Sequence, residues 1–347
     1  MPILYDTQLQ TLSSTNTFFK GKTFLELVDA KKLYALILSK NVCMTTKKWW
    51  EDHNTLFQQG EIPNEHNFLK LLYRSLVRKN NKFYLKTSYF SRLEYGRVYP
   101  NKLMSQGIIR RKLRHFLCKD FYYDIDMVNA HPNILRCVCK TFGIACPYLQ
   151  KYCSRRDEVL KYIMEESGFD RDTTKSCIIS LINGGKHVNY LIQHGARIEG
   201  DYSFLEKFQM EMERITEKII ECNKEIKALH IELTRNKTQN KNGSFMAQYL
   251  QMYEQLLLQI LYDAAMEKHL IAQNNSAICL CHDGAMILKS VFSEEMTIDL
   301  FIDFLNKKVT NDTGMDIIFK SKEFDEYMEV ETKLQAEGID WTDDVGV

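Results

Sequence analysis

Two short segments of this chain place aspartates beside runs of apolar residues. Asp126 lies in the aromatic and β-branched run 121–128, and Asp283 stands in a His-Asp-Gly triplet between the apolar runs 277–281 and 285–288. A carboxylate beside buried strand residues is costly unless it binds a metal ion, a cation or several hydrogen-bond donors. We expect the two segments to meet in the fold and to supply such a partner jointly.

A third segment carries cations at helical spacing. Arg171, Lys175, Ile179 and Asn183 recur every four residues, so they share one face of a helix that ends at a glycine pair. Two cations one turn apart can hold a triphosphate. A helix with an exposed basic edge and a glycine cap fits the same pattern, so this segment alone leaves both interpretations open.

Positive charge is concentrated between residues 86 and 119. This stretch has nine cations against the single anion Glu94, a local net charge of +8, and aromatic residues interleave with the cations. Such a stripe suits a nucleic-acid phosphate backbone, and a solvated helix face is the alternative. The nine cations are Lys86, Arg92, Arg97, Lys102, Arg110, Arg111, Lys112, Arg114 and Lys119.

Periodicity predicts the elements that position these groups. Residues 121–138 predict a strand, a polar turn and a helix, and residues 277–288 predict a hairpin with its polar residues at the turn. A heptad pattern over 208–233 predicts one helix of about 30 residues, followed by a polar break at 235–244 and a second helix packed antiparallel to it. Helix-period segments such as 24–28 and 33–37 predict a small, mostly helical module over residues 1–85.

Composition limits the class of protein. The chain has 347 residues, 45% of them hydrophobic and 26% charged, and 46 basic against 45 acidic residues give a net charge of +1. No apolar run reaches the length of a membrane span, and the first residues lack the pattern of a signal peptide, so we expect an intracellular protein. The ten cysteines are expected to be reduced, and the spacing of Cys137/Cys139 and Cys279/Cys281 disfavours zinc.

Four separated segments resemble, in the same order, the signature set of the family A DNA polymerases and the single-subunit phage RNA polymerases. Gly96-Arg97 with Gln106 resembles their primer–template segment, and Asp126 resembles the first palm carboxylate. The helix from Arg171 resembles the fingers helix that grips the incoming nucleotide, and His282-Asp283 resembles the second palm motif. The Asn-x-His-Pro stretch 129–132, together with His-Asp-Gly, is most similar to the transposon-virus polymerase group (TV-Pol) of viruses and mobile elements.

This resemblance implies an α+β right-hand polymerase with a small antiparallel palm sheet and largely helical fingers. Residues 1–85 would form a helical, thumb-like module, and residues 86–330 the palm and fingers core, with the fingers insertion at about 140–275. Residues 331–347 would be an acidic and disordered C-terminal tail. The implied activity is template-directed nucleotidyl transfer, foremost by a DNA-directed DNA polymerase of a virus or mobile element.

The resemblance also assigns roles to residues. Asp126 and Asp283 would bind two Mg²⁺ ions, with Mn²⁺ as an alternative, and Asp124 on the same strand face would support or compete with them. Lys175 would act near the leaving phosphates as a catalytic cation. The nucleotide-binding residues would be Arg171, Lys175, Asn183, Gly184, His131 and Asn129, and the primer–template contacts Arg97, Gln106, Arg110, Arg111, Arg114 and His282.

Departures from the family pattern leave the choice of sugar open. Asn183 stands where the family usually has tyrosine, Ile179 where DNA polymerases have an aromatic residue, Gly284 where they often have glutamate, and His131 where they have the glutamate that helps to exclude ribose. A primase or an RNA polymerase is therefore one alternative function, and a catalytically inactive nucleic-acid-binding replication factor is another.

The expected partners follow from the same resemblance. They are a DNA primer–template and nucleoside triphosphates, with a replicative helicase or a processivity factor as a further candidate, and no membrane. The expected location is the cytoplasm or nucleus of a host cell, or a viral replication site.

Overall fold

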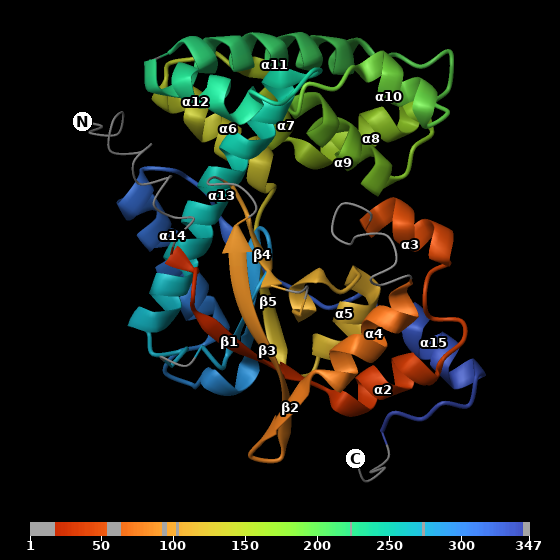
Figure 1. Cartoon of the computed structure of the whole chain (residues 1–347). Helices are drawn as coiled ribbons and strands as arrows, with labels where there is room; N and C mark the ends of the chain where they lie inside the picture. Colours follow the sequence, from red (N-terminus) through yellow and green to blue (C-terminus); the bar gives the residue numbers. More distant parts are fainter. Residues whose placement is uncertain are drawn as a thin grey trace.

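The computed structural model describes residues 18–53, 64–91, 96–101, 104–222, 224–272 and 275–342. The described chain combines many helices with two small antiparallel sheets, and a helical insertion stands above the sheets in Figure 1. Arg92, Glu94 and Lys102, named above in the basic stretch, lie outside the described residues. None of the described helices is long and apolar enough to cross a membrane.

The first sheet contains both aspartate segments. Its strands are β5 (Tyr122–Met127), β6 (Ile278–Leu280), β7 (Gly284–Leu288) and β8 (Phe319–Lys322), in the spatial order β6-β7-β5-β8. The predicted hairpin is confirmed as β6 and β7, and the predicted strand, turn and helix are confirmed as β5 followed by α6 (Ala130–Thr141). Asn129 forms the turn in the left-handed conformation, with a φ of 52°, which asparagine tolerates better than most residues.

The second sheet corrects the expectation of a helical N-terminal module. Strand β3 (Lys82–Ser91) pairs antiparallel with β1 (Thr23–Val28), β2 (Leu76–Lys79) and β4 (Val98–Pro100). Helix α2 (Ala30–Leu38) corresponds to the predicted segment 33–37, and α3 (Thr46–His53) and α4 (Glu65–Arg74) are further helices of this region, but the segment 23–28 is a strand. A short apolar run fits either period, and pairing with β3 decides in favour of the strand.

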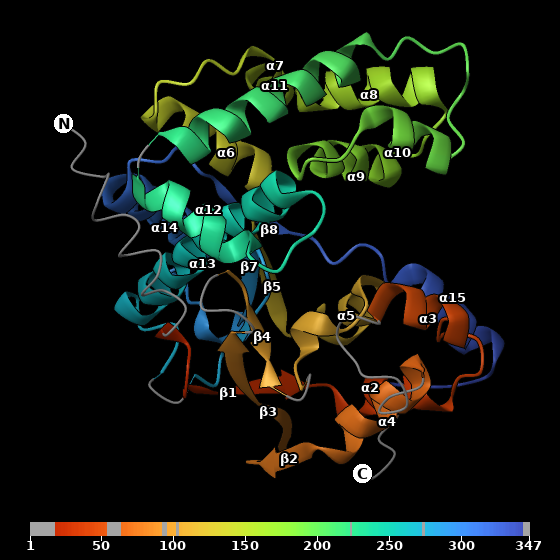
Figure 2. The ribbon, with the colours of Figure 1, turned by 45° about the horizontal axis from the view of Figure 1, so that its top comes forward.

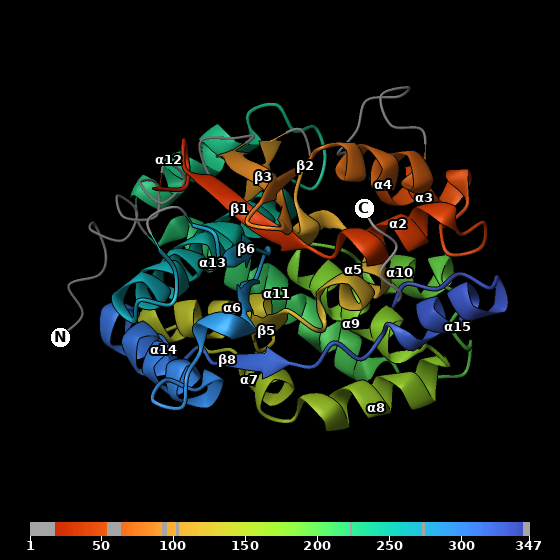
Figure 3. The ribbon, with the colours of Figure 1, turned by 90° about the horizontal axis from the view of Figure 1, so that it is seen from below.

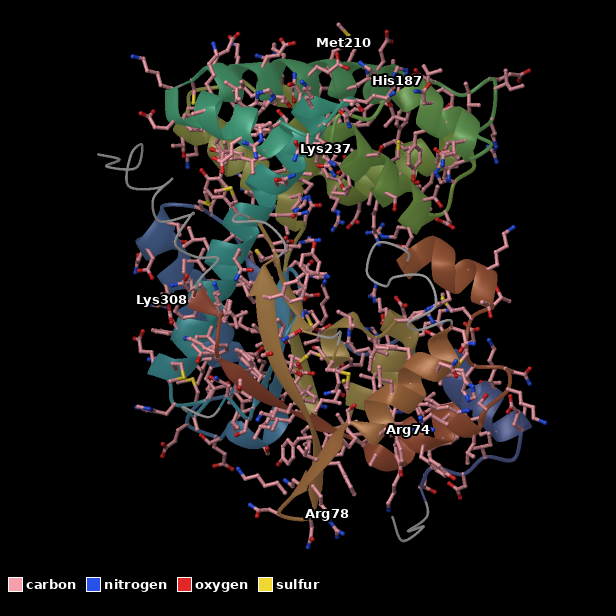
Figure 4. All side chains as sticks on the ribbon, in the orientation of Figure 1. Arg74, Arg78, His187, Met210, Lys237 and Lys308 are labelled. Carbon is pink, nitrogen blue, oxygen red and sulfur yellow. The ribbon has the colours of Figure 1, made fainter. Side chains whose placement is uncertain are left out.

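In the sequence the helical insertion runs from β5 to β6, and in Figures 1 and 2 most of it stands above the sheets. It begins with α6 and continues through α7 (Pro147–Ser154), α8 (Arg156–Ser167), α9 (Arg171–Ile182), α10 (His187–Gln193), α11 (Ser203–Glu221), α12 (Lys224–Thr234) and α13 (Lys241–Glu267). The expected single helix over 208–233 is wrong, because the apolar seam is divided between α11 and α12 where Cys222 becomes exposed. Helices α12 and α13 pack together, and the turn between them carries Lys237 (Figure 4).

The C-terminal segment up to Thr342, where the described residues end, packs on the rest of the chain. After a short 3-10 turn (Lys289–Val291), α14 (Ile298–Thr313) packs against α13, and β8 leads to α15 (Met328–Ala336). Helix α15 packs on α5 (Arg111–Cys118), which follows another 3-10 turn (Gln106–Ile108) (Figure 3). Val330 and Leu334 are buried, and the ring of Trp341 contacts that of Phe116 edge-on, so apolar burial holds the segment in place.

The core continues from the sheets into the insertion. Buried side chains of β5 and β7, such as Ile125 and Ile287, belong to the same apolar cluster as Leu257 and Leu261 of α13. All ten cysteines are free, five of them buried, four partly buried and one exposed. The long helix α13 therefore ties the helical insertion to the sheet that carries the aspartates.

Candidate active site

The register of β5 and β7 brings the two aspartates together. Asp126 pairs with Gly284 across the antiparallel ladder, and the N–H of Met127 donates to the carbonyl oxygen of Asp283 at 3.0 Å. Both residues thus lie at the same end of neighbouring strands, although they are far apart in the sequence.

Gly284 is required by how closely these strands approach. A Cβ atom there would lie 2.0 Å from the carbonyl oxygen of Ile125 and 2.5 Å from Oδ1 of Asp126, which no side chain can accommodate without movement. Position 284, where the family that the sequence resembles often has glutamate, therefore requires glycine in this chain for steric reasons.

Asp124 adds a third carboxylate on the same face of β5. Its side chain is 4% exposed, and its Oδ1 has no hydrogen-bond partner. Burial, reinforced by the charge of Asp126, raises the pKa of Asp124 to about 7. The same two causes raise the pKa of Asp283 to about 6. The site therefore holds more negative charge than its own surroundings neutralise.

Lys322 pairs directly with one of these carboxylates, and sequence analysis did not find it. It lies opposite Asp124 on β8 and reaches diagonally to Asp126, where its Nζ is 2.5 Å from Oδ2. Asp126 is more accessible than Asp124, since its side chain is 13% exposed. A lysine alternating with small and apolar residues at the end of a strand was the only available signal.

The donor set suits a hard divalent cation. Carboxylate oxygens are the ligands that Mg²⁺ prefers, and the unpartnered oxygen of Asp124 shows that the site has unused acceptor capacity. Asp126 and Asp283 would hold the metal, with Asp124 behind them. Within the described residues, no group of three or more His, Cys, Asp or Glu side chains is already arranged around one metal position.

A buried ionic network borders the carboxylates, and its centre, Glu254 of α13, was also missed. Arg97 binds Glu254 through two bonds of 2.5 and 2.8 Å, and Nε2 of His131 lies 3.7 Å from the same carboxylate. Burial opposes ionisation of Glu254, but Arg97 and His131 outweigh it and hold its pKa at about 2. Arg97 and His131, predicted to contact nucleic acid or nucleotide, are thus joined to α13. An acidic residue in the apolar middle of a helix was the signal.

Two predicted primer–template contacts serve the interior instead. Gln106 is fully buried, and its amide donates to the carbonyl oxygen of Leu27 and accepts from the thiol of Cys118. Arg110 binds Glu65 through both Nε and a terminal nitrogen, at 2.9 and 3.1 Å. Gln106 is therefore closed to a nucleic acid, and the partly exposed Arg110 is bound to a carboxylate of the protein itself.

The remaining predicted contacts are divided between the site and α15. Arg114 donates to the carbonyl oxygens of Gly107 and Ile109, while Arg111 pairs with Glu326 at 3.2 Å. His282 lies beside the ring of Tyr99, and burial followed by the charge of Arg97 lowers its pKa to about 4. His282 is thus neutral at physiological pH.

The basic residues of α5 pair with acidic residues of the C-terminal segment. Lys112 pairs with Glu329, and Lys119 pairs with Glu331 at 2.6 Å, in addition to the pair of Arg111 with Glu326. Of these three acidic residues, Glu331 belongs to the segment expected to be a disordered tail, and together they neutralise part of the stripe expected to bind phosphates.

The predicted nucleotide-gripping helix is α9, on the insertion. Its cations bind nearby carboxylates, Arg171 to Asp157 of α8 at 2.5 Å and Lys175 to Asp172 at 2.7 Å. Three of the four side chains are exposed and Lys175 is partly exposed, so these pairs are weak and can be exchanged for a ligand.

The C-terminal end of α9 meets the start of α13. Asn240 donates to the carbonyl oxygen of Asn183 at 3.0 Å, and a Cβ atom at Gly184 would lie 3.0 Å from Cα of Gly243. Gly184 has a φ of 75°, so it also ends the helix in the left-handed conformation. Asn183 and Gly184 therefore fix the position of α9 on α13.

Comparison with known proteins gives similarities to a viral protein and to a solved polymerase domain. No protein-family model matches the chain. The putative helicase V13 of Sputnik virophage is 29% identical over 234 residues, which cover 63% of this chain and 29% of that protein. The chain therefore spans less than a third of the length of this relative. Among solved structures, the POL domain of Pol1 from M. smegmatis, in complex with DNA primer-template and dNTP, is 12% identical with a TM-score of 0.48, covering 82% of this chain and 56% of that chain.

Proposed function

We propose that this chain is a template-directed nucleotidyltransferase, foremost a DNA polymerase of family A type related to the TV-Pol group. The observation that carries the proposal is the β5–β7 register, which sets Asp126 beside Asp283 at one end of a small antiparallel sheet. Two carboxylates from separate segments, with a surplus of buried negative charge, match the demand of a two-metal phosphoryl transfer. The order and spacing of the sequence motifs support the same function.

Each residue would act through its own charge. Asp126 and Asp283 would hold two Mg²⁺ ions, which supply charge neutralisation at the primer hydroxyl and at the leaving pyrophosphate. Arg171 and Lys175 would exchange their aspartate partners for the triphosphate, and Lys175 would donate a proton to the leaving phosphate. The Arg97–Glu254–His131 network would keep β4, α6 and α13 in fixed positions around the site.

The partners are proposed on the same basis. They are a DNA primer–template, nucleoside triphosphates and a replicative helicase, which the virophage relative suggests through its name and its greater length. A viral replication site is the corresponding location.

Primer extension tests the proposal directly. The full chain would be given a primed DNA template and Mg²⁺, with dNTPs and NTPs in parallel lanes, and compared with Asp126→Asn and Asp283→Asn. We expect extension by the wild type and a loss of about 100- to 1,000-fold in both variants, as for other groups acting on transition-state charge. The lane in which extension occurs decides between DNA and RNA synthesis.

A matched control separates chemistry from folding. Asp299→Asn removes one exposed carboxylate on α14 and should leave extension unchanged. Extension by Asp126→Asn at the wild-type rate would contradict the metal-binding role. Intact DNA binding without extension by the wild type would favour the inactive replication factor.

A further inference from the structure

A pocket of about 450 Å³ lies on the insertion, where α7, α8 and the start of α11 meet. Lys151, Arg155 and Lys207 contribute three cations to its lining, and Glu158 contributes the one anion. The Nζ of Lys151 lies 5.7 Å from the ring centroid of Phe204, and Arg155 is 3.9 Å from Glu158. The cations therefore converge on one pocket, whose lining keeps a net charge of +2.

Aromatic rings form the walls of the same pocket. Tyr148 and Phe204 meet edge-on with their centroids 5.9 Å apart, and Tyr162 lies on the α8 side with its hydroxyl donating to Asp201. Both tyrosines are partly exposed, whereas Phe204 is buried. Rings beside cations are the arrangement that binds single-stranded nucleic acids, because bases stack on the rings and phosphates pair with the cations. The volume is in the range of small-ligand pockets, so it can hold one nucleotide.

Helix α8 lines the pocket and also packs on α9, the helix proposed to grip the incoming nucleotide. Asp157 of α8, which binds Arg171 of α9, directly precedes Glu158 of the pocket in the sequence. The incoming nucleotide must pair with the next template base, so uncopied template has to approach along the insertion that carries α9. This argument rests on the proposed function.

We propose that this pocket binds the single-stranded, uncopied part of the template strand. One base stacks on Tyr148 or Tyr162, and the adjoining phosphates pair with Lys151, Arg155 and Lys207. A free nucleotide shares this chemistry of a planar base and phosphate, so the test must separate the two sources.

Binding of primer–templates with graded overhangs tests the proposal. Labelled duplexes with 5′ template overhangs of different lengths, from none to about ten nucleotides, would be titrated with the full chain at constant salt, and the affinity followed by fluorescence anisotropy. We expect the wild-type affinity to rise with overhang length until the strand reaches the pocket. The variant Lys151→Glu/Lys207→Glu should lose this gain, and Tyr148→Ser should reduce it about tenfold, within the range for one stacked base. Binding to the flush duplex should not change.

The matched control is Lys161→Glu/Lys218→Glu. It changes the charge equally with two exposed lysines of α8 and α11 that do not line the pocket, and it should keep the dependence on overhang length. An equal gain with overhang length in wild type and pocket variant would overturn the proposal. A second arm titrates dATP alone; loss of dATP binding in the pocket variant, with the overhang dependence intact, would overturn the assignment to the template strand. Failure of the proposed function is distinguishable, because it appears as absent primer extension while overhang-dependent binding persists.

Discussion

The ammonium group of Lys322 lies 2.5 Å from Oδ2 of Asp126, on the carboxylate that we propose as a metal ligand. The two residues belong to neighbouring strands, β8 and β5, and Lys322 stands opposite Asp124. In the absence of a divalent ion, Lys322 is therefore the counter-ion of the carboxylate pair. A lysine and a metal ion cannot occupy the same side of one carboxylate, so they compete.

Replacing Lys322 by methionine should strengthen Mg²⁺ binding. The substitution keeps most of the aliphatic side chain and removes the competing charge, so we expect a several-fold lower dissociation constant in titration calorimetry of the protein without nucleotide. Lys308→Met on α14, where the lysine pairs with Glu267 and Asp312, is the control and should have no effect. Unchanged or weaker Mg²⁺ binding by Lys322→Met would disprove the competition.

Replacing Asp124 by asparagine should stabilise the metal-free protein at high pH only. The pKa of Asp124 is raised to about 7 from an ordinary 3.8, so the folded state keeps a proton that the unfolded state releases, and its stability falls as pH rises between these values. Thermal unfolding should show equal Tm values for both proteins near pH 4 and a Tm about 3 °C or more higher for the variant at pH 8. A Tm difference independent of pH would contradict the buried charge.

Replacing Gly284 by alanine should separate β5 from β7. The new Cβ would lie 2.0 Å from the carbonyl oxygen of Ile125, so we expect a loss of about 3 kcal/mol in the free energy of unfolding, at the upper end for overpacking. Gly143→Ala is the control, because that glycine has a positive φ but open space around it and should cost only about 1 kcal/mol. Denaturant titration measures both, and equal losses would show that strand contact is unimportant.

Removing the negative charges that cover α5 should strengthen nucleic-acid binding. With Glu326, Glu329 and Glu331 replaced by glutamine, Arg111, Lys112 and Lys119 lose their partners. We expect tighter DNA binding at low salt and a log–log salt dependence steeper by up to about 3. The triple variant Glu217→Gln/Glu294→Gln/Glu295→Gln has the same change in charge elsewhere. An unchanged salt slope would mean that DNA does not reach α5.

Local sequence patterns predicted the elements that carry the carboxylates. The alternation around Asp126, the hairpin around Asp283 and the four-residue spacing from Arg171 correspond to β5, β6–β7 and α9. These features depend on nearest neighbours in the chain, so they are readable from the sequence.

Pairings between segments far apart in the chain could not be predicted from the sequence. The strand β1 is fixed by β3, Gln106 is buried by bonds to Leu27 and Cys118, and the acidic C-terminal helix is ordered by α5. The role of Glu254 could not be predicted for the same reason, because its partner Arg97 lies on another element. A basic stretch was thus interpreted as a surface for phosphates when several of its cations have acidic partners within the protein.

Helix α13 has 27 residues, a length of about 40 Å, and it contacts both α9 and the surroundings of the carboxylate site. Its first turn is bonded to Asn183 at the end of α9, and Glu254 in its middle holds Arg97 and His131 next to the carboxylates. Because α13 is held at both points, a change in its tilt at one point changes its position at the other. Any movement of α9 toward a nucleotide would therefore also rotate α13, which carries Glu254. Closure around the substrate and alignment of the metal site would thus be coupled through one helix.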